Sequence, residues 1–479
     1  MLLSRAWHTD ELFGFAESYR PSWLSIGLGT IGALAAAVVL PQYAILRHKQ
    51  RPWTDLGTPF WGHTLTMLKV GVDIWVDLFI SKVERQTGRP FRSVLRYAGF
   101  QHAVIMRYDV YRDHVQKLDQ AGDLVPDLPP PFVKLLGKSS ILNMRASFQA
   151  GLTPQHRRIR SKVMRALAPA QVLQHRAGMQ QVSRRLLEDL ASASQAGSAP
   201  FEPIAKSFAM SISARLIVGE ELSGEYLQEM EACFVDILAG ALSPPLDLGR
   251  FSAFGRAMQA RRKLLPLVKK MMAHPAVSRT ALGELLLAGE EGEPLTLEEI
   301  VDTVVTLLLA GQITTNHALV QLLVDLHKHP EEVQLIRAES EKDFGSIEQD
   351  SHTLRVIKES LRLTPPINVF RRACPGRAVS LGEAGVVPAG CSMAPLLRDL
   401  DDRSWNPARW AALPLDHLLV FGGNQPHSCV GRHLALLELH IFVRELCGTY
   451  TLEVLEAEEQ SMMGLKCWKD GLPVCLERL

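Results

Sequence analysis

The residues with the clearest chemical potential lie near the C-terminus, in the stretch FGGNQPHSCVGRHLA at 421–435. A glycine-rich turn precedes Cys429, and the apolar spacing of LALLELHIFVREL predicts a helix that begins close to the thiol. Exposed N–H groups at a helix N-terminus favour the thiolate, which is both a nucleophile and a metal ligand. The alternative is a small apolar cysteine packed where a loop joins a helix. The local pattern leaves both interpretations open.

A zinc site is a further alternative for the same stretch, with His427, Cys429 and His433 as ligands. A fourth ligand at a recognisable spacing is missing, so this interpretation is disfavoured. The seven cysteines of the chain are odd in number, scattered, and contain no CxxC pair. This pattern argues against a disulfide framework and indicates a reducing compartment.

A second group of polar residues lies in the longest predicted helix, TLEEIVDTVVTLLLAGQITTNHALVQLLVDLHKHP. Thr296 and Glu299 form a capping box at its start, and a proline ends it. In its centre, Gly311, Thr314 and Thr315 share one helix face at i, i+3 and i+4. A glycine inside a helix costs about 1 kcal/mol relative to alanine. Either a functional distortion or close helix–helix packing would explain its presence.

Two charged patterns also have a structural and a functional interpretation. Glu359 and Arg362, in ESLR, lie one helical turn apart, and a surface pair at that spacing contributes only a few tenths of a kcal/mol. His156 and Arg160, in HRRIR, lie one turn apart on another predicted helix. The basic residues of that helix could equally form a solvated face.

The predicted elements of the body are mostly helices. Apolar residues recur at helical spacing in 162–190, 201–218, 226–242 and 253–272, with Pro/Gly/Ser breaks between them. Strand patterns are sparse and fall at 100–106, 378–381, 450–455 and 473–477. The expected fold class is therefore mainly α with a small β component. With 52 Lys and Arg against 51 Asp and Glu, no nucleic-acid partner is expected.

The N-terminal region predicts one transmembrane helix. Residues 21–46 carry no charge, and about 19 residues of helix span roughly 28 Å, close to the thickness of a bilayer core. Basic residues follow at once, so the positive-inside rule puts the body in the cytoplasm. We expect a lumenal segment at 1–20, the anchor at 21–46, a linker at 47–60 and the catalytic domain at 61–479. A cleaved signal peptide is the alternative, although acids rather than a basic region precede the apolar stretch.

Taken in order, these segments resemble the cytochrome P450 haem-thiolate monooxygenases over nearly the whole chain. CVGRHLA is similar to the family motif Cys-x-Gly-x-x-x-Ala, AGQITT to the oxygen-binding turn of the central helix, and ESLR to Glu-x-x-Arg. PFWGHTL, at 59–65, resembles the segment that follows the anchor in microsomal members. The resemblance implies the cytochrome P450 fold, a triangular helical haem domain, held at the endoplasmic reticulum membrane by the single N-terminal helix.

The resemblance also implies the cofactor and the residues around it. Haem b would be bound through Cys429 as the proximal thiolate ligand of iron, with Thr314, Gly311 and Thr315 at the oxygen site. The other residues assigned to haem are His427, Arg160, His156, Arg371, Phe421 and Gly431. Glu359, Arg362 and Arg409 would form a buried charged network, and an NADPH-dependent reductase would supply electrons.

The chain departs from the family pattern in three places. Phe421 lies eight residues before Cys429, where the family has seven, and 388–409 is several residues shorter than usual. Ile313 replaces the acidic residue that normally precedes the oxygen-site threonine. In the family this acid and the threonine guide protons to the oxygen site, whereas isoleucine can neither carry charge nor hold water.

Three functions therefore remain open. The first is a monooxygenase that oxidises or hydroxylates a lipophilic substrate. The second is an isomerase or dehydratase that rearranges a lipid hydroperoxide without a reductase, and the third is a haem-binding membrane protein without turnover. The segments that the resemblance places around the pocket, 122–142, 235–251 and 367–370, are mainly apolar. AGQ-x-T is similar to sterol demethylases and PFWGHTL to retinoid and plant-steroid hydroxylases, so a sterol or another isoprenoid is favoured.

Overall fold

The computed structural model describes most of the chain after residue 92. The described residues are 93–97, 101–106, 111–126, 130–141, 154–195, 197–219, 222–241, 243, 245–287, 295–341, 349–367, 371–374, 376–382, 385–387, 389–395, 402–422, 428–455, 459–462 and 465–479. The expected lumenal segment, transmembrane anchor and linker lie outside these residues, as does the start of the expected catalytic domain.

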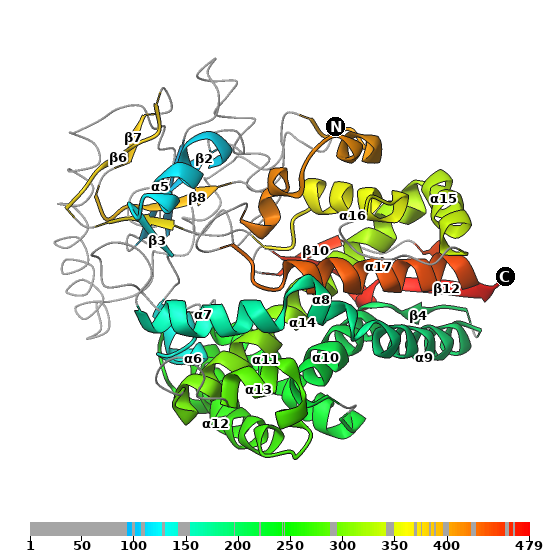
Figure 1. The fold of residues 1–479 in the computed structure, drawn as a ribbon, viewed down its shortest axis with the longest axis horizontal. Helices are drawn as coiled ribbons and strands as arrows, with labels where there is room; N and C mark the ends of the chain where they lie inside the picture. The colour runs from blue at the N-terminus through cyan, green and yellow to red at the C-terminus, as the bar shows by residue number, and fades with distance from the viewer. Residues whose placement is uncertain are drawn as a thin grey trace, which may run out of the picture.

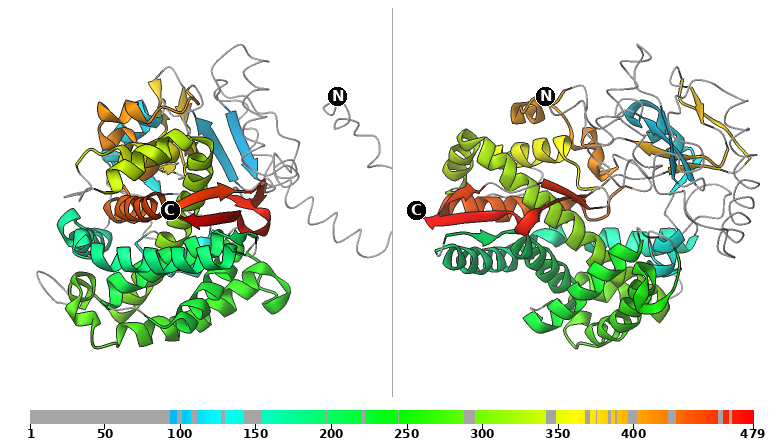
Figure 2. Two further views of the ribbon diagram at one scale, coloured as in Figure 1. Left: turned by 90° about the vertical axis from the view of Figure 1, so that its right-hand side faces the viewer. Right: turned by 180° about the vertical axis from the view of Figure 1, so that it is seen from behind.

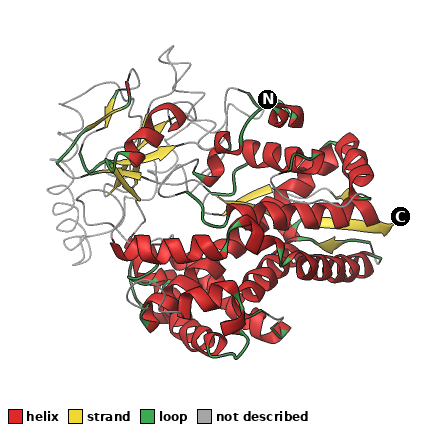
Figure 3. Ribbon diagram, viewed as in Figure 1, coloured by secondary structure: helices red, strands yellow, loops and turns green. Residues whose placement is uncertain are grey.

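Helices dominate the described part of the chain (Figures 1 and 3). The α-helices are α5 Gln116–Gln120, α6 Pro130–Leu136, α7 Pro154–Ala166, α8 Pro169–Leu173, α9 Arg176–Ser194, α10 Glu202–Val218, α11 Gly224–Ala241, α12 Ala253–Met272, α13 Ala281–Leu287, α14 Leu297–Lys328, α15 Pro330–Ser340, α16 His352–Leu363 and α17 Arg432–Thr449. The mainly α prediction is confirmed, and α12 begins and ends where the apolar spacing predicted.

The strands within the described residues form four small sheets. They are β1 Ser93–Tyr97, β2 Gln101–Met106, β3 Leu124–Pro126, β4 Ala199–Pro200, β5 Arg371–Ala373, β6 Val379–Ser380, β7 Val386–Val387, β8 Ser392–Pro395, β9 Tyr450–Val454, β10 Glu459–Met462, β11 Leu465–Trp468 and β12 Pro473–Arg478. The largest sheet has the order β1-β2-β8-β5-β3, with β2 and β8 parallel. A second sheet, β4-β12-β9, brings the C-terminus beside α9, and the two sheets lie at different ends of the molecule (Figure 2).

One predicted helix, 162–190, is wrong in its extent. The structure divides this range among α7, α8 and α9. Ala168 adopts an extended conformation, with φ −63° and ψ 151°, immediately before Pro169. Proline disfavours a helical conformation in the residue before it and cannot donate an N–H to the preceding turn. The apolar spacing continues across this break, so periodicity alone did not reveal it.

Helix α14 runs through the core. It contains 32 residues and is roughly 48 Å long. The predicted capping box is present, with the Glu299 N–H donating to Thr296 Oγ1 at 3.2 Å and the Thr296 N–H donating to Glu299 Oε2 at 2.8 Å. Within the described residues, α14 alone has the length and apolar composition to cross a membrane, and most of that stretch is buried inside the protein.

Helices α10 and α17 pack close to α14 and complete the central layer. Phe442 of α17 makes edge-to-face contacts with Phe201 and Phe208, with ring centroids 5.8 and 5.0 Å apart. All three rings are buried. This packing fixes the position of α17, whose first residue lies three positions after Cys429.

Candidate functional site

The turn that carries Cys429 is built by backbone hydrogen bonds and glycines. Gly422 has a positive φ of 81°, which lets the chain reverse after Phe421. The Cys429 N–H donates to the backbone oxygen of Phe421 at 2.8 Å. Gly431 then precedes the first turn of α17 and accepts from the Ala435 N–H at 2.9 Å. The predicted loop-to-helix junction at the cysteine is confirmed.

Cys429 lies just before α17, in a turn whose neighbouring residues are mostly half-buried. Cys429 is exposed, whereas Cys447 within that helix is buried. Desolvation by the surrounding chain is the largest influence on the Cys429 thiol and raises its pKa. The Gly431 N–H, which hydrogen-bonds the sulfur, and the cations Arg160 and Arg432 oppose that shift. A partly desolvated sulfur with an N–H and two cations beside it suits a metal-bound thiolate.

The residues around Cys429 fit a haem group bound through this sulfur. Gly431 lies next to the sulfur, because a Cβ on this residue would be 4.0 Å from Cys429 Sγ, in ordinary van der Waals contact. Arg160, in α7, lies beside the cysteine turn, where its Nη2 donates to the Ser428 backbone oxygen at 2.6 Å. His156 lies one turn earlier in the same helix and is buried. A cation at this place suits the carboxylates of haem.

A window of partly exposed residues opens on one face of α14. Ala310 is exposed, and Leu307, Gly311 and Thr314 are half-buried, although the helix is buried over most of its length. These positions share one helical face. Gly311 also permits close packing on its other side, because a Cβ there would lie 2.6 Å from Ser213 Oγ. The close-packing interpretation of this glycine therefore has structural support, and α14 continues through it as one helix.

The two neighbouring threonines of α14 have different partners. The Thr314 hydroxyl donates to the Ala310 backbone oxygen at 2.8 Å and stays at the window. The Thr315 hydroxyl instead donates to Oε2 of Glu438, in α17, at 2.9 Å, and both residues are buried. Sequence spacing placed Thr314 and Thr315 together on one face, whereas their contacts direct them to different neighbours.

Glu438 is a buried acid that the sequence analysis did not single out. Burial raises the pKa of its carboxyl to about 8, and the hydrogen bond from Thr315 opposes that shift. Its Oε1 has no hydrogen-bond partner within the described residues. The carboxyl is therefore mainly protonated at neutral pH. A lone acid among the apolar residues LALLELHIFV was the signal that could have identified it.

The predicted network around Glu359 is present. Arg362 donates from Nη2 to Oε1 at 2.7 Å and from Nε to Oε2 at 2.9 Å, and Arg409 donates from Nε to Oε1 at 3.1 Å. Trp410, which the sequence analysis missed, adds an Nε1–H bond to Oε2 at 2.9 Å. Glu359 is 0% exposed. The surface-pair interpretation of ESLR is therefore wrong.

His427, Arg371 and Ile313 complete the set of residues that the sequence singled out. His427 lies outside the described residues, so the zinc alternative that depends on it is untested. Arg371 belongs to β5, whose backbone alone is described at this position. Ile313 is half-buried against the core, and its backbone oxygen accepts from His317 Nδ1 at 2.8 Å. Burial lowers the pKa of His317 and keeps its ring neutral.

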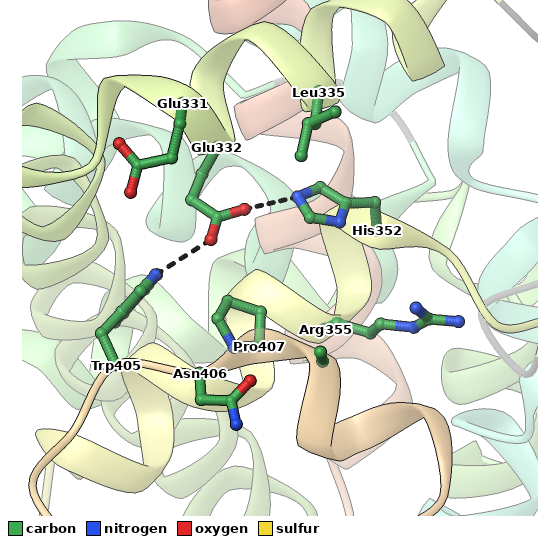
Figure 4. Close-up of a pocket in the computed structure, with 9 residues that line it drawn as sticks. Glu331, Glu332, Leu335, His352, Arg355, Trp405, Asn406 and Pro407 are labelled. Carbon is green, nitrogen blue, oxygen red and sulfur yellow. Dashed lines mark hydrogen bonds and ion pairs between the residues drawn. The ribbon is translucent and has the colours of Figure 1, made fainter.

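A separate pocket of about 310 Å³ lies between α15, α16 and 405–408 (Figure 4). The indole of Trp405 donates to Glu332 Oε1 at 3.1 Å, and His352 Nε2 lies 2.6 Å from Glu332 Oε2. Its lining is mixed, with charged and polar side chains beside Leu335, Trp405, Pro407 and Ala408. Asn406 connects this pocket to the Glu359 network. Its backbone N–H donates to Glu359 Oε1 at 3.0 Å.

Comparisons with known proteins agree with this geometry. Residues 101–467 match the family model for cytochrome P450. Abscisic acid 8'-hydroxylase 1 of Arabidopsis thaliana is 24% identical over 383 residues, which cover 74% of this chain and 77% of that protein. Cytochrome P450 85A3 of Solanum lycopersicum is 23% identical over 437 residues, which cover 85% of this chain and 89% of that protein.

The fold is also similar to a solved structure, the retinoic acid bound cyanobacterial CYP120A1. The TM-score is 0.71 at 22% sequence identity, and the alignment covers 89% of this chain and 99% of the other. The family match spans most of the sequence, and the described residues within it include Cys429, the window of α14 and the Glu359 network. The chain therefore belongs to the cytochrome P450 family of haem-thiolate monooxygenases.

Proposed function

We propose that this protein hydroxylates or otherwise oxidises a lipophilic substrate, with O2 and with electrons that an NADPH-dependent reductase delivers. The observation that carries the proposal is the exposed Cys429 at the start of α17, next to the Gly431 N–H and Arg160. An exposed cysteine with an N–H and cations near its thiol is suited to hold iron as a thiolate.

The chain's own residues would divide the work around the haem. Cys429 would hold the iron, and Arg160, His156, Arg371 and His427 would neutralise the haem carboxylates. Haem bound here supplies the iron that activates O2. Thr314 would hold a proton at Oγ1, since its hydroxyl lies at the window and already donates to the Ala310 backbone oxygen.

The window favours an apolar substrate. Leu307 and Ala310 present hydrocarbon, and Thr314 offers the one hydroxyl among the four residues of the window. Abscisic acid and retinoic acid, which the names of two similar proteins mention, are both isoprenoid carboxylic acids. A sterol or another isoprenoid is accordingly the favoured substrate class. We place the catalytic domain on the cytoplasmic side of the endoplasmic reticulum membrane, anchored by 21–46.

The second candidate is rearrangement of a lipid hydroperoxide, as an isomerase or dehydratase that needs no reductase. Ile313 favours it, because this side chain cannot relay a proton beside Thr314. The extra residue between Phe421 and Cys429 is a second departure from the family pattern.

Isotopically labelled O2 separates the two candidates. We would incubate the haem-loaded protein with a reductase, NADPH and a panel of sterols and other isoprenoids, and analyse the products by mass spectrometry. One labelled oxygen atom in an NADPH-dependent product supports the monooxygenase. Turnover of a lipid hydroperoxide without reductase, with no label from O2, supports the second candidate.

A further inference from the structure

Asp302 lies at a junction of three segments, away from the proposed haem site. Its side chain is 2% exposed, and its Oδ1 accepts from Arg261 Nη2 in α12 at 2.8 Å. Its Oδ2 accepts the backbone N–H of Ser139 at 3.2 Å. Arg261 also donates from Nη1 to the Leu135 backbone oxygen, at the end of α6, at 2.8 Å. One carboxylate and one guanidinium thus join α12, α14 and the segment that follows α6.

A second polar contact lies one turn further along α14. Ser140 Oγ and Thr306 Oγ1 are 2.6 Å apart, and both are buried. Thr306 Oγ1 also lies 2.7 Å from the backbone oxygen of Asp302. The loop after α6 is therefore attached to a full turn of α14 by hydrogen bonds at both ends of that turn.

The close approach of the loop depends on a glycine. Gly137 has a φ of +97°, and a Cβ at this residue would lie 2.0 Å from Asp302 Oδ1. The carboxylate therefore occupies the space that any side chain would need. Leu135, Leu136 and Ile141 around this contact are buried in the main core, so the polar contacts lie in an apolar setting where an unpaired charge would be costly.

The contacts of Asp302 and Thr306 lie on α14 just before the window. Thr306 directly precedes Leu307, the first residue of the window, and Ala310 follows one turn later. Helix α6 packs against α11, α12 and α14. The segment 130–141 therefore borders the N-terminal edge of the window. The contacts of Ser139 with Asp302 and of Ser140 with Thr306 attach it to α14 there.

We infer that Asp302 is a latch whose ion pair with Arg261 holds the segment 130–141 closed along the edge of the window. Separation of the two side chains opens this edge to an incoming apolar molecule. The identity of that molecule rests on the proposed function, whereas the latch is a property of the fold. Breaking the pair leaves each helix with its own hydrogen bonds, so movement is confined to 130–141 and its contacts.

Hydrogen–deuterium exchange of the haem-loaded full chain tests the latch. We would compare Asp302→Asn, Arg261→Gln and the double variant, in peptides covering 130–141 and 436–447. Each single change should raise exchange in 130–141 about tenfold, with no change in the α17 peptide. The double variant should restore part of the protection, because Asn and Gln can hydrogen-bond each other without charge.

A matched control and a fallback variant complete the comparison. Glu445→Gln breaks the exposed Arg184–Glu445 pair, whose closest atoms are 2.8 Å apart, and should leave exchange in 130–141 unchanged. If Asp302→Asn does not accumulate with haem, Arg261→Lys serves instead. Lysine keeps the positive charge but cannot reproduce the paired guanidinium bonds to Asp302 and to the Leu135 backbone oxygen. Unchanged exchange in 130–141, or an equal rise in both peptides, would overturn the latch.

The access role has its own measurement. Phenylimidazole, an apolar probe that ligates haem iron, reports its arrival by the change in the haem spectrum. In stopped flow, each single variant should bind it at least about threefold faster than the unmodified protein. Faster exchange without faster binding would overturn the access role. If no lipid is oxidised in any assay, the proposed function fails while these two measurements still decide the latch.

Discussion

Arg160 in α7 donates from Nη2 to the backbone oxygen of Ser428, the residue directly before Cys429, at 2.6 Å and across 268 positions of sequence. The same nitrogen lies 3.2 Å from Ser428 Oγ. This contact brings a cation to the cysteine turn, where it opposes the rise that burial causes in the pKa of the Cys429 thiol. The relationship links α7 to the start of α17.

Replacing Arg160 by leucine should weaken haem retention without unfolding the body. The substitution removes the bond to Ser428 and a positive charge beside the sulfur. We expect haem to transfer to an excess of apomyoglobin at least about tenfold faster, since hydrogen bonds to a charged group contribute about 1.5–3 kcal/mol. Arg165→Leu, at an exposed position of the same helix, is the control and should transfer haem at the original rate. Equal rates of haem transfer for the two variants would show that Arg160 does not contribute to haem retention.

Replacing Glu359 by alanine should prevent accumulation of the haem-loaded protein. The carboxylate is 0% exposed and accepts from Arg362, Arg409 and Trp410. Its loss leaves buried cations uncompensated, at a cost of roughly 3–5 kcal/mol. The measurement is the yield of soluble protein with haem, compared with Glu331→Ala at a side chain that is 64% exposed. A normal yield for Glu359→Ala would contradict the importance of the network.

Glu438 predicts an unusual dependence of stability on pH. Burial raises the pKa of its carboxyl from 4.5 to about 8, so the folded protein holds a proton that the unfolded chain releases above 4.5. The contribution of this group therefore becomes less favourable as pH rises between about 4.5 and about 8, by up to about 1.4 kcal/mol per pH unit. Glutamine at 438 keeps a neutral acceptor for Thr315 and should remove this slope.

Urea unfolding of the two proteins at several pH values checks this prediction. The difference in the free energy of unfolding, variant minus unmodified protein, should increase from about pH 5 to about pH 8 and then level off. Glu445→Gln, at the other end of α17, provides the control and should give a constant difference. A constant difference for Glu438→Gln as well would mean that the carboxyl is ionised throughout this range.

Ile313→Asp distinguishes the two candidate functions. In a monooxygenase, a carboxyl group beside Thr314 would take up protons from solvent and pass them on, so the product formed per NADPH consumed should rise about twofold or more. In an enzyme that rearranges hydroperoxides, the same change would only place charge in an apolar pocket and lower turnover. Ile313→Asn is the control, because asparagine has nearly the same size as aspartate but carries no charge. Reductase-free turnover of a lipid hydroperoxide that falls in Ile313→Asp would reject the leading proposal.

The parts of this fold that follow from local rules were predictable from sequence. The capping box of α14 depends on two residues three positions apart, Thr296 and Glu299, and both of its hydrogen bonds are present. The Glu359 network was predictable in part through the resemblance, which implied Glu359, Arg362 and Arg409 without any knowledge of their separation in space but did not include Trp410.

Contacts between distant helices were not predictable in the same way. Helical spacing placed Thr314 and Thr315 on one face, but the direction of Thr315 is set by Glu438, 123 positions later. The division of 162–190 is a different case, because its cause, Pro169, is a local signal in the sequence that apolar spacing alone does not take into account. The role of Asp302 required the positions of Arg261 and Ser139, which come from two other segments.

The most direct test of the account is the absorption spectrum of the reduced, carbon monoxide-bound protein after Cys429→Ser. The account predicts a thiolate signature in the unmodified protein, its retention in Cys475→Ala, and its loss in Cys429→Ser in any fraction that still binds haem. A Cys429→Ser protein that retained the thiolate signature would contradict the assignment of Cys429 as the iron ligand.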